Sequence, residues 1–380
     1  MAKTKTFLSA FLLALTISGI AFVATIHFGA AQSGTNVSYI ISQDSTWTPA
    51  GSPYTLTGNT LVYQGVTLTI EPGVTVNLGS YYIEVNGTLS AMGTPPDKIT
   101  FNGGQITFTS SSNGWSEQTD SGCLIENANI DQTSIISSNP LKIDSSNING
   151  EITAVSSIIS NSIITGTITG SNLIISNNNV EGDITTQVNS AIGSFNNESS
   201  VISNNVVTGS INVGYFNLAT SGDTSSVFNN TVTGSISAVS GEGAPEIYNN
   251  AVSGNGNGPG IECSGYGSVF NNFIYSCQDG IGLYTPRGFG GNLPCNATVE
   301  NNLVVDNTRG IDVELTSTFG PSAICPTILS NSISGNSVGI YLSETDYTAT
   351  PTIQNNNLQN NSNYNFDLSA PNNVDATNNW

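Results

Sequence analysis

Residues 298–315 read TVENNLVVDNTRGIDVEL, and this stretch decides the fold. It contains a pair of asparagines, another asparagine five places after the pair and a glycine three places later. Arg309, Asp312 and Glu314 are its charged residues near the end. They could form a catalytic cluster, or they could be outward side chains on a scaffold that needs only the asparagines and the apolar residues. The rest of the chain bears on this question because it repeats the same pattern.

One template covers all the repeats: an apolar residue, two spacers, an asparagine, one spacer and an apolar residue. The other matching segments are IISNSIITGTIT (158–169), IISNNNVEGDIT (174–185), VISNNVVTGSIN (201–212), SVFNNTVTGSIS (226–237), EIYNNAVSG (246–254), SVFNNFIYSCQDGIGLY (268–284), TILSNSISGNSVGIYL (327–342) and TIQNNNLQNNSNYNFDL (352–368). The asparagine column is Asn178, Asn205, Asn230, Asn250, Asn272, Asn302, Asn331 and Asn356, with Ser162 in the same place earlier. Most steps are between twenty and thirty residues, which is typical of a solenoid.

Within each repeat, apolar residues alternate with polar ones. Ile311 and Val313 alternate with Asp312 and Glu314, which is the period of a β-strand. Short strands rich in β-branched residues should each stack on the equivalent strand of the next coil, about 4.8 Å away. The sequence therefore predicts an all-β fold, a β-solenoid of parallel sheets.

Asparagine suits the bends between these strands. It tolerates the left-handed backbone conformation that turns a strand sharply. Its amide can also donate to and accept from the asparagines above and below, so a buried column satisfies itself. Gly280, Gly310 and Gly339 follow their column asparagines by eight residues and predict a second bend. The repeated asparagines and glycines thus need no catalytic explanation.

The repeats resemble those of right-handed parallel β-helix proteins, whose fold is shared by pectate lyases and many prokaryotic surface proteins. The segment LTIEPGVTVNLGSYYIEVNGTLSAMG (68–93) is similar to the first coils of secreted members. The resemblance implies a right-handed, single-stranded parallel β-helix over residues 55–380, preceded by a lead-in at 32–54. We expect the helix to continue beyond Trp380 in a longer chain, because the closing NNVDATNNW resembles a late coil and a solenoid needs a terminal cap.

The charge of the chain limits its partners. Only 8% of the residues are charged, and the formal net charge is -20. Beyond the N-terminal segment the basic residues are Lys98, Lys142, Arg287 and Arg309. So few cations cannot neutralise a phosphate backbone, which excludes nucleic acid as a partner. The same charge disfavours polyanionic substrates unless a cation bridges them.

The N-terminus has the layout of an export signal. Two lysines precede an apolar run from Phe7 to about Phe28, and small residues follow before Gln32. Residues 1–31 are therefore expected to be a cleaved signal peptide or a retained membrane anchor, with the rest of the chain secreted or at the cell surface. The only histidine, His27, lies in this segment. The remaining chain therefore cannot use a Ser-His-Asp or Cys-His nucleophile.

The cysteines of an exported chain are expected to form disulfides. Cys295 and Cys325 lie at nearly the same phase of successive repeats, so they are expected to face each other and pair. Cys263 and Cys277 would form a second pair, leaving Cys123 alone. The alternative is that all five are buried apolar thiols.

The position between Ile311 and Val313 should point outward, and its column reads Glu262, Gly282, Asp312, Tyr341 and Asp367. Pectate-lyase-like enzymes hold calcium on such an acidic stripe and use an arginine as base. By that resemblance, Arg309, Asp312 and Glu314 are candidate catalytic residues. Glu262, Asp312 and Glu314 are candidate Ca²⁺ ligands. The family's extended arginine-containing motifs are absent, and Arg309 precedes the bend instead of lying on the outward face. Outward acids on an acidic protein are mostly a solvated face, which is the other interpretation of the stripe.

Aromatic residues on a polar surface are candidate sugar-stacking groups. They include Trp115, Tyr284 and Tyr341, and Tyr341 is itself a member of the acidic column. Asn36, Asn86, Asn197, Asn229, Asn296 and Asn360 begin N-x-S/T sequons, which predict glycosylation if the host glycosylates exported proteins.

Together these observations predict an exported, non-enzymatic β-helix that needs no cofactor and contacts surface glycans or other cell-surface proteins. Contact with a membrane is expected only through the N-terminal segment or a C-terminal anchor. The alternative function is a Ca²⁺-dependent polysaccharide lyase or a glycoside hydrolase. It would require carboxylates that converge, or an arginine beside a metal site.

Overall fold

The structure is a computed structural model that describes residues 34–186, 199–214, 223–240, 243–254, 256–284, 295–315, 325–344, 351–369 and 374–380. The expected signal segment, residues 1–31, lies outside this range. Within it, no helix is both long and apolar enough to cross a membrane. The part described below belongs to one compact unit, Gly34–Trp380.

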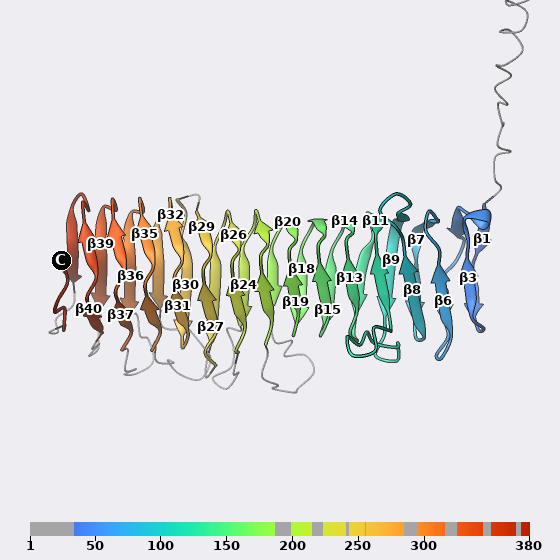
Figure 1. Cartoon of the computed structure of the whole chain (residues 1–380), viewed down its shortest axis with the longest axis horizontal. Helices are drawn as coiled ribbons and strands as arrows, with labels where there is room; N and C mark the ends of the chain where they lie inside the picture. The colour runs from blue at the N-terminus through green and yellow to red at the C-terminus, as the bar shows by residue number, and fades with distance from the viewer. Residues whose placement is uncertain are drawn as a thin grey trace, which may run out of the picture. The chain divides into compact units, whose positions relative to one another are not determined.

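This unit is a parallel β-helix whose coils follow one another along a single axis (Figure 1). Each coil contributes strands to three columns, and every strand pairs in parallel with its equivalents on the neighbouring coils. The coil that contains the opening sequence shows the pattern: β34 (Thr298–Glu300), β35 (Leu303–Val305) and β36 (Arg309–Leu315). The predicted fold class, an all-β parallel β-helix, is confirmed.

The first column forms the 14-stranded sheet. Its strands are β3 (Ser45–Trp47), β6 (Thr67–Ile70), β8 (Thr88–Met92), β10 (Leu124–Glu126), β13 (Lys142–Asp144), β16 (Ile158–Ser160), β19 (Ile174–Ser176), β22 (Val201–Ser203), β25 (Ser226–Phe228), β28 (Glu246–Tyr248), β31 (Ser268–Phe270), β34, β37 (Thr327–Leu329) and β40 (Thr352–Gln354).

The second and third columns together form the 28-stranded sheet, because β7 (Thr75–Val85) and β9 (Ile99–Phe108) run through both. The other strands of the second column are β1 (Thr35–Val37), β4 (Tyr54–Leu56), β11 (Ala128–Asp131), β14 (Asn147–Asn149), β17 (Ile163–Thr165), β20 (Asn179–Glu181), β23 (Val206–Val207), β26 (Thr231–Val232), β29 (Ala251–Ser253), β32 (Phe273–Tyr275), β35, β38 (Ser332–Ser334) and β41 (Asn357–Gln359).

The other strands of the third column are β2 (Ile40–Ile41), β5 (Thr60–Val62), β12 (Ser134–Ser137), β15 (Ile152–Val155), β18 (Ile168–Ser171), β21 (Ile184–Thr186), β24 (Ile211–Gly214), β27 (Ile236–Ser240), β30 (Pro259–Gly265), β33 (Asp279–Tyr284), β36, β39 (Val338–Glu344) and β42 (Tyr364–Ser369). One short 3-10 helix, η1 (Pro49–Gly51), lies in the first coil.

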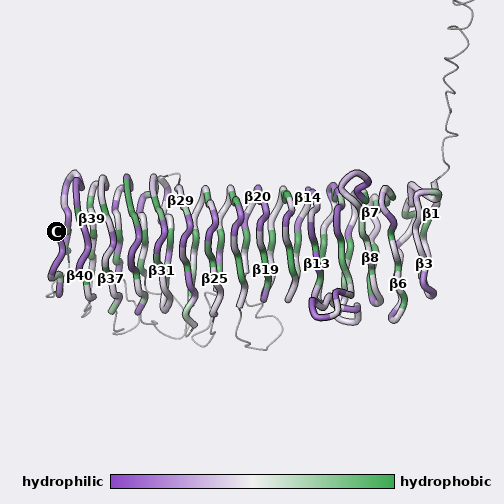
Figure 2. Tube along the Cα trace, in the orientation of Figure 1, coloured by the Kyte–Doolittle hydropathy of each residue, from purple (hydrophilic) through white to green (hydrophobic). Residues whose placement is uncertain are grey.

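The core lies inside the coils and consists of stacked branched aliphatic residues. Ile281, Ile311 and Ile340 are in register on successive coils, and all three are fully buried. Figure 2 shows hydrophobic stretches recurring at matching places from coil to coil. Because side chains alternate along each strand, residues between the buried ones face outward. The core therefore fixes which side chains line the outer faces.

The predicted asparagine ladder is confirmed. Each column asparagine accepts, at its side-chain oxygen, hydrogen bonds from the backbone N–H and side-chain amide of the preceding column asparagine. Eight such amides run from Asn178 to Asn356, and Asn379 adds one more in the closing segment. Ser162 occupies the column as expected, since its N–H donates to the side-chain oxygen of Asn178 at 2.9 Å.

From its sequence, each column asparagine was expected to have two roles, forming the bend and forming the ladder. In the structure, two adjacent residues share these roles. The left-handed conformation belongs to the residue before the column, such as Asn271 with φ of 57° or Asn301 with φ of 56°. The column residue itself forms the ladder. A pair of asparagines therefore recurs because a sharp turn and a stack of amides need adjacent positions.

A second, shorter ladder lies at the next bend. The side-chain amide of Asn307 donates to Asn336 at 3.1 Å, and that of Asn336 donates to Asn361 at 3.0 Å. The glycines expected there have a steric reason: a Cβ on Gly280 would lie 2.5 Å from the carbonyl oxygen of Gly310. Together these contacts fix where the third-column strands begin.

The boundary predicted at residue 55 is wrong. β1 lies within the expected lead-in of 32–54, yet it pairs in register with β4, and β3 pairs with β6. The lead-in lacks the asparagine template, so the repeat pattern missed it. Its buried residues Val37, Ile41 and Trp47 nevertheless complete a coil.

Candidate functional site

The candidate site lies on the outer face of β33 and β36 in the third column. These strands pair so that Asp279 is beside Arg309, Gly282 beside Asp312 and Tyr284 beside Glu314. On the next coil, Tyr341 is beside Asp312. The column expected from sequence, from Glu262 to Asp367, is therefore in register on successive coils.

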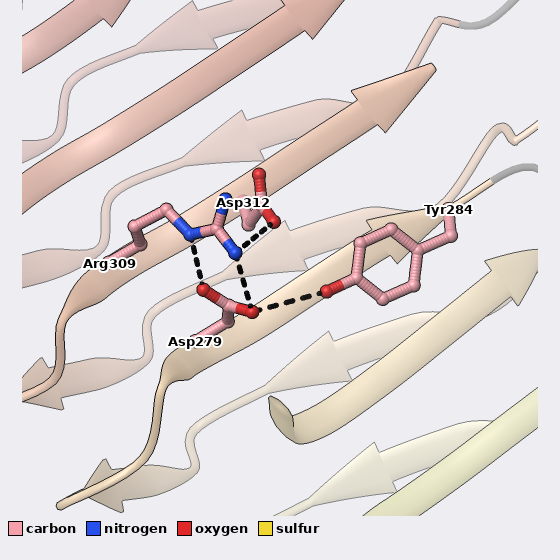
Figure 3. Close-up of polar contacts among 4 residues, drawn as sticks. All are labelled: Asp279, Tyr284, Arg309 and Asp312. Atoms are coloured by element: carbon pink, nitrogen blue, oxygen red, sulfur yellow. Dashed lines mark hydrogen bonds and ion pairs between the residues drawn. The ribbon is translucent and has the colours of Figure 1, made fainter. Parts of the chain in front are cut away.

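Arg309 and Asp279 form a bidentate ion pair (Figure 3). The Nε atom of Arg309 donates to Oδ1 of Asp279, and Nη2 donates to Oδ2 at 3.0 Å. The Asp279 side chain is 3% exposed, whereas that of Arg309 is 25% exposed. This two-bond arrangement is the strongest form of a side-chain ion pair, and it holds the guanidinium in one orientation.

Asp312 lies on the other side of the guanidinium. Its Oδ2 is 3.2 Å from Nη2 of Arg309, and its side chain is 0% exposed. That contact is an ion pair without hydrogen-bond geometry, so neither carboxyl oxygen has a hydrogen-bond partner in the described structure. The carboxyl group of Asp312 is therefore buried, and the polar contact that the structure gives it is the ion pair with Arg309.

Burial raises the pKa of Asp312 to about 7, against the lowering effect of Arg309. The negative charges of Asp279 and Glu314 raise this pKa further. A carboxyl group with such a pKa is largely protonated just below neutral pH, so it can donate a proton where an ordinary aspartate cannot.

The ring of Tyr284 covers Gly282, which lies between Glu262 and Asp312 in the column. A Cβ on Gly282 would lie 2.5 Å from the Tyr284 ring, so the ring occupies the space of the missing side chain. The hydroxyl group of Tyr284 lies 3.4 Å from Oδ2 of Asp279 and donates to it (Figure 3). Burial and the nearby Asp312 and Asp279 raise the pKa of Tyr284, which keeps its hydroxyl protonated.

Tyr341 lies against Arg309 on the following coil. The guanidinium carbon is 5.2 Å from the centre of the Tyr341 ring, within the range of a cation–π contact. Both tyrosines predicted as ligand candidates thus belong to the cluster. They contact its charged groups, so in this structure they are packing partners of Arg309 and Asp279.

The candidate calcium ligands are not assembled. Glu262 is in register with Gly282, so a whole coil separates it from Asp312, and the cation beside Asp312 is Arg309. Glu262 accepts a hydrogen bond from Ser264 at 3.2 Å, and burial raises its pKa. Among the described residues, no three His, Cys, Asp or Glu side chains form a group that could hold a metal ion. The donor set does not fit Ca²⁺.

Of the three candidate catalytic residues, the structure brings Arg309 and Asp312 together, and Glu314 follows Asp312 on the same face of β36. Sequence reasoning missed Asp279. The signal was present, because Asp279 and Arg309 stand immediately before Gly280 and Gly310, which were already aligned. Residues that precede aligned glycines should be neighbours, and these two have opposite charges.

The predicted disulfides are not formed. The N–H of Cys325 donates to the carbonyl oxygen of Cys295 at 3.2 Å, so the two are at the same phase, but Cys295 is fully buried whereas Cys325 is exposed. Cys263 stacks between Ala238 and Leu283 in the third column. Cys277 instead lies at the second ladder, where its N–H donates to Asn307.

No protein-family model and no curated protein matches the sequence. Among solved structures, the chain is similar to the periplasmic alginate epimerase AlgG, with 12% identity over 83% of this chain and 76% of that one and a TM-score of 0.33. A mutant of that enzyme gives 11% identity over 80% and 77% of the two chains and a TM-score of 0.35. An alginate lyase from Paenibacillus sp. str. FPU-7 gives 14% identity over 76% and 93% and a TM-score of 0.29. These similarities concern the β-helix fold.

Proposed function

We propose that this protein is an exported glycoside hydrolase that acts on a neutral polysaccharide, with Asp312 as the general acid. The observation that supports this function is the fully buried carboxyl group of Asp312, whose pKa is raised to about 7. Perturbed acids of this kind are concentrated at functional sites. The N-terminal layout supports export.

Glu314 is the partner that the reaction needs. It lies two residues after Asp312 on the same face of β36, and its side chain is half-buried. Strand geometry separates their Cα atoms by about 6.6 Å. In inverting glycosidases it is the two carboxyl groups, rather than the Cα atoms, that are about 6.5–9.5 Å apart, with a water molecule between them. Asp312 would protonate the glycosidic oxygen while Glu314 removes a proton from the attacking water.

Arg309 positions Asp312 and keeps the cluster from accumulating negative charge. Because its guanidinium is already bound to Asp279, it has little capacity to recruit an acidic sugar. The formal net charge of -20 also repels polyuronides. Neutral glycans therefore fit the site better than polyuronides do. Among the residues that the structure describes, no group of carboxylates is assembled to bind the metal ion of a Ca²⁺-dependent lyase.

The experiment is incubation of the purified protein with neutral polysaccharides, namely glucans, mannans, galactans and xylans, followed by measurement of new reducing ends. The wild-type protein should release them, whereas Asp312→Asn and Glu314→Gln should not. Glu246→Gln is the matched control, since Glu246 is an exposed acid on β28 outside the cluster. If the wild type releases no reducing ends from any of these polysaccharides, the proposal is wrong.

A second candidate function is favoured by one observation: solvent does not reach Asp312 in this structure. A scaffold that binds glycans without cleaving them would have no need of an accessible acid. It would retain polysaccharide in a pull-down assay, release no reducing ends, and bind equally well after Asp312→Asn.

A further inference from the structure

The buried carboxyl group of Asp312 borders a gap in its own column. Gly282 presents no side chain beside Asp312, whereas Glu262 fills the corresponding place on the preceding coil. Two residues after Gly282, on the same face of β33, Tyr284 is beside Glu314. The outer face of β33 from Gly282 to Tyr284 therefore runs alongside both of the acids that the proposed reaction uses.

The ring of Tyr284 occupies this gap. A Cβ built on Gly282 would have three atoms of Tyr284 as its nearest neighbours, with Cζ and Oη at 2.5 Å and Cε2 at 2.7 Å. The hydroxyl end of the ring therefore lies over Gly282, the in-register neighbour of Asp312. Asp312 is 0% exposed, and neither of its carboxyl oxygens has a hydrogen-bond partner in the described structure. The ring thus fills the space that a ligand needs in order to reach this carboxyl group.

The ring can leave this position without moving the strand. Its hydroxyl group donates to Oδ2 of Asp279 at 3.4 Å, which is long for a hydrogen bond between oxygen atoms (Figure 3). Tyr284 is the last residue of β33 and is half-buried, so part of its ring faces solvent. Rotation about its χ1 bond carries the ring to another staggered position, away from Gly282.

The closed position of the ring resembles that of a bound sugar. A pyranose is, like the phenol of Tyr284, a six-membered ring that carries hydroxyl groups. A sugar hydroxyl in this place would donate to Asp279 as the phenol hydroxyl does, and another would pair with the unsatisfied carboxyl group of Asp312. The surrounding acids disfavour a ligand that carries a negative charge.

We propose that Tyr284 is a movable cover of Asp312, and that the space it vacates over Gly282 holds the pyranose ring whose glycosidic oxygen Asp312 protonates. The identity of the ligand rests on the proposed function, whereas the movement of the ring does not. The cover lets an acid that solvent does not reach in the closed state act on a substrate in the open state. It also gives a reason for glycine at position 282, since a side chain there would keep the ring from closing.

The movement is tested by labelling carboxyl groups with a water-soluble carbodiimide and glycinamide, followed by peptide mass spectrometry. The labelling rate of Asp312 is divided by that of the exposed Glu246 in the same protein. Tyr284→Phe removes the hydrogen bond to Asp279 and should raise this ratio about tenfold, and Tyr284→Ala should raise it further. Gly282→Ala should also raise it, because the added methyl group displaces the ring while every carboxyl group is retained.

The backbone of Gly282 lies outside the left-handed region, so alanine is tolerated there. Tyr364→Ala is the matched control, because Tyr364 is a 59% exposed tyrosine on β42 and should leave the ratio unchanged. Far-UV circular dichroism shows whether each variant is folded. If folded Tyr284→Ala and Gly282→Ala label Asp312 no faster than the wild type does, Tyr284 is not a cover.

The ligand is tested in the double variant Tyr284→Ala, Glu314→Gln, which leaves Asp312 accessible and should not cleave a glycan. Neutral hexasaccharides of glucose, mannose, galactose and xylose are added, and at least one should slow the labelling of Asp312. The pyranose assignment is overturned if none of them does. Release of reducing ends by the wild type is measured separately. Its absence, together with the expected labelling rates, would contradict the proposed hydrolysis and leave the cover in place.

Discussion

The side-chain amide of Asn272 donates a hydrogen bond to the side-chain oxygen of Asn302, 3.0 Å away on the next coil. Asn272 in turn accepts two hydrogen bonds from Asn250, one from its backbone N–H and one from its amide. Each buried amide therefore satisfies groups on both neighbouring coils. This relationship ties the repeated asparagine to the stacking of the coils, and it stabilises the strands that carry the candidate site.

Replacing Asn272 should be costly, while replacing its neighbour should not. Asn272→Ala leaves two buried donors of Asn250 without an acceptor, so we expect the free energy of unfolding to fall by about 2–4 kcal/mol. Asn272→Ser should cost less, as Ser162 shows that a serine fits the column. Asn271→Gly is the control, because Asn271 has φ of 57° and glycine accepts that conformation. Chemical denaturation measures the free energy of unfolding of all three variants. Equal losses of stability at Asn271 and Asn272 would contradict the assignment of the turn to Asn271 and of the ladder to Asn272.

Removing Arg309 alone should destabilise the third column. Arg309→Met leaves Asp279 and Asp312 buried without their cation, and breaking such an arrangement costs about 3–5 kcal/mol. Adding Asp279→Asn and Asp312→Asn removes the unpaired charges, so the triple variant should recover part of the loss. If Arg309→Met is as stable as the wild type in denaturant, the ion pairs do not form in solution.

The stability of the protein should depend on pH through Asp312. Its pKa is raised from the ordinary 3.8 to about 7, so between these values the folded state binds more protons than the unfolded state. The group's stabilising contribution is therefore fully present below about pH 4 and is lost as pH rises through 7. The shift corresponds to about 4 kcal/mol. Asp312→Asn should remove the share of this decline that comes from Asp312, which thermal denaturation from pH 4 to pH 8 would detect as a difference from wild type.

The buried cysteines should resist thiol reagents in the native state. Burial raises the pKa of Cys123 and of Cys295 to about 11 and also raises that of Cys263. Because the thiolate is the reactive form, these residues should react with a chromogenic disulfide reagent only after unfolding. Rapid reaction of Cys123 or Cys295 in the folded protein would contradict their burial.

The sequence predicted the solenoid well because the requirement repeats. Each coil carries one asparagine at a constant sequence spacing from its branched aliphatic residues. This regularity can be recognised in the sequence without knowing any contact. The acidic column was predicted for the same reason, since alternation places Asp312 between Ile311 and Val313. The first coil was missed because it is built from Val37, Ile41 and Trp47 without the asparagine.

The environment of Asp312 could not be predicted in the same way. Alternation assigns a residue to the outer face, but it does not say what else lies there. Asp312 is buried beside the Arg309 guanidinium, and the ring of Tyr284 lies over Gly282 on the neighbouring strand. These contacts are specific to one pair of coils. A repeat carries no information about them.

The most direct test is a titration of the Asp312 carboxyl group by carbon-13 NMR on protein labelled at aspartate, with Asp312→Asn used to assign its signal. The account predicts an apparent pKa close to 7, because burial favours the neutral form of this acid more than the neighbouring Arg309 favours the charged form. A value near 4, that of an ordinary solvated aspartate, would contradict it and remove the basis for a general acid at this position.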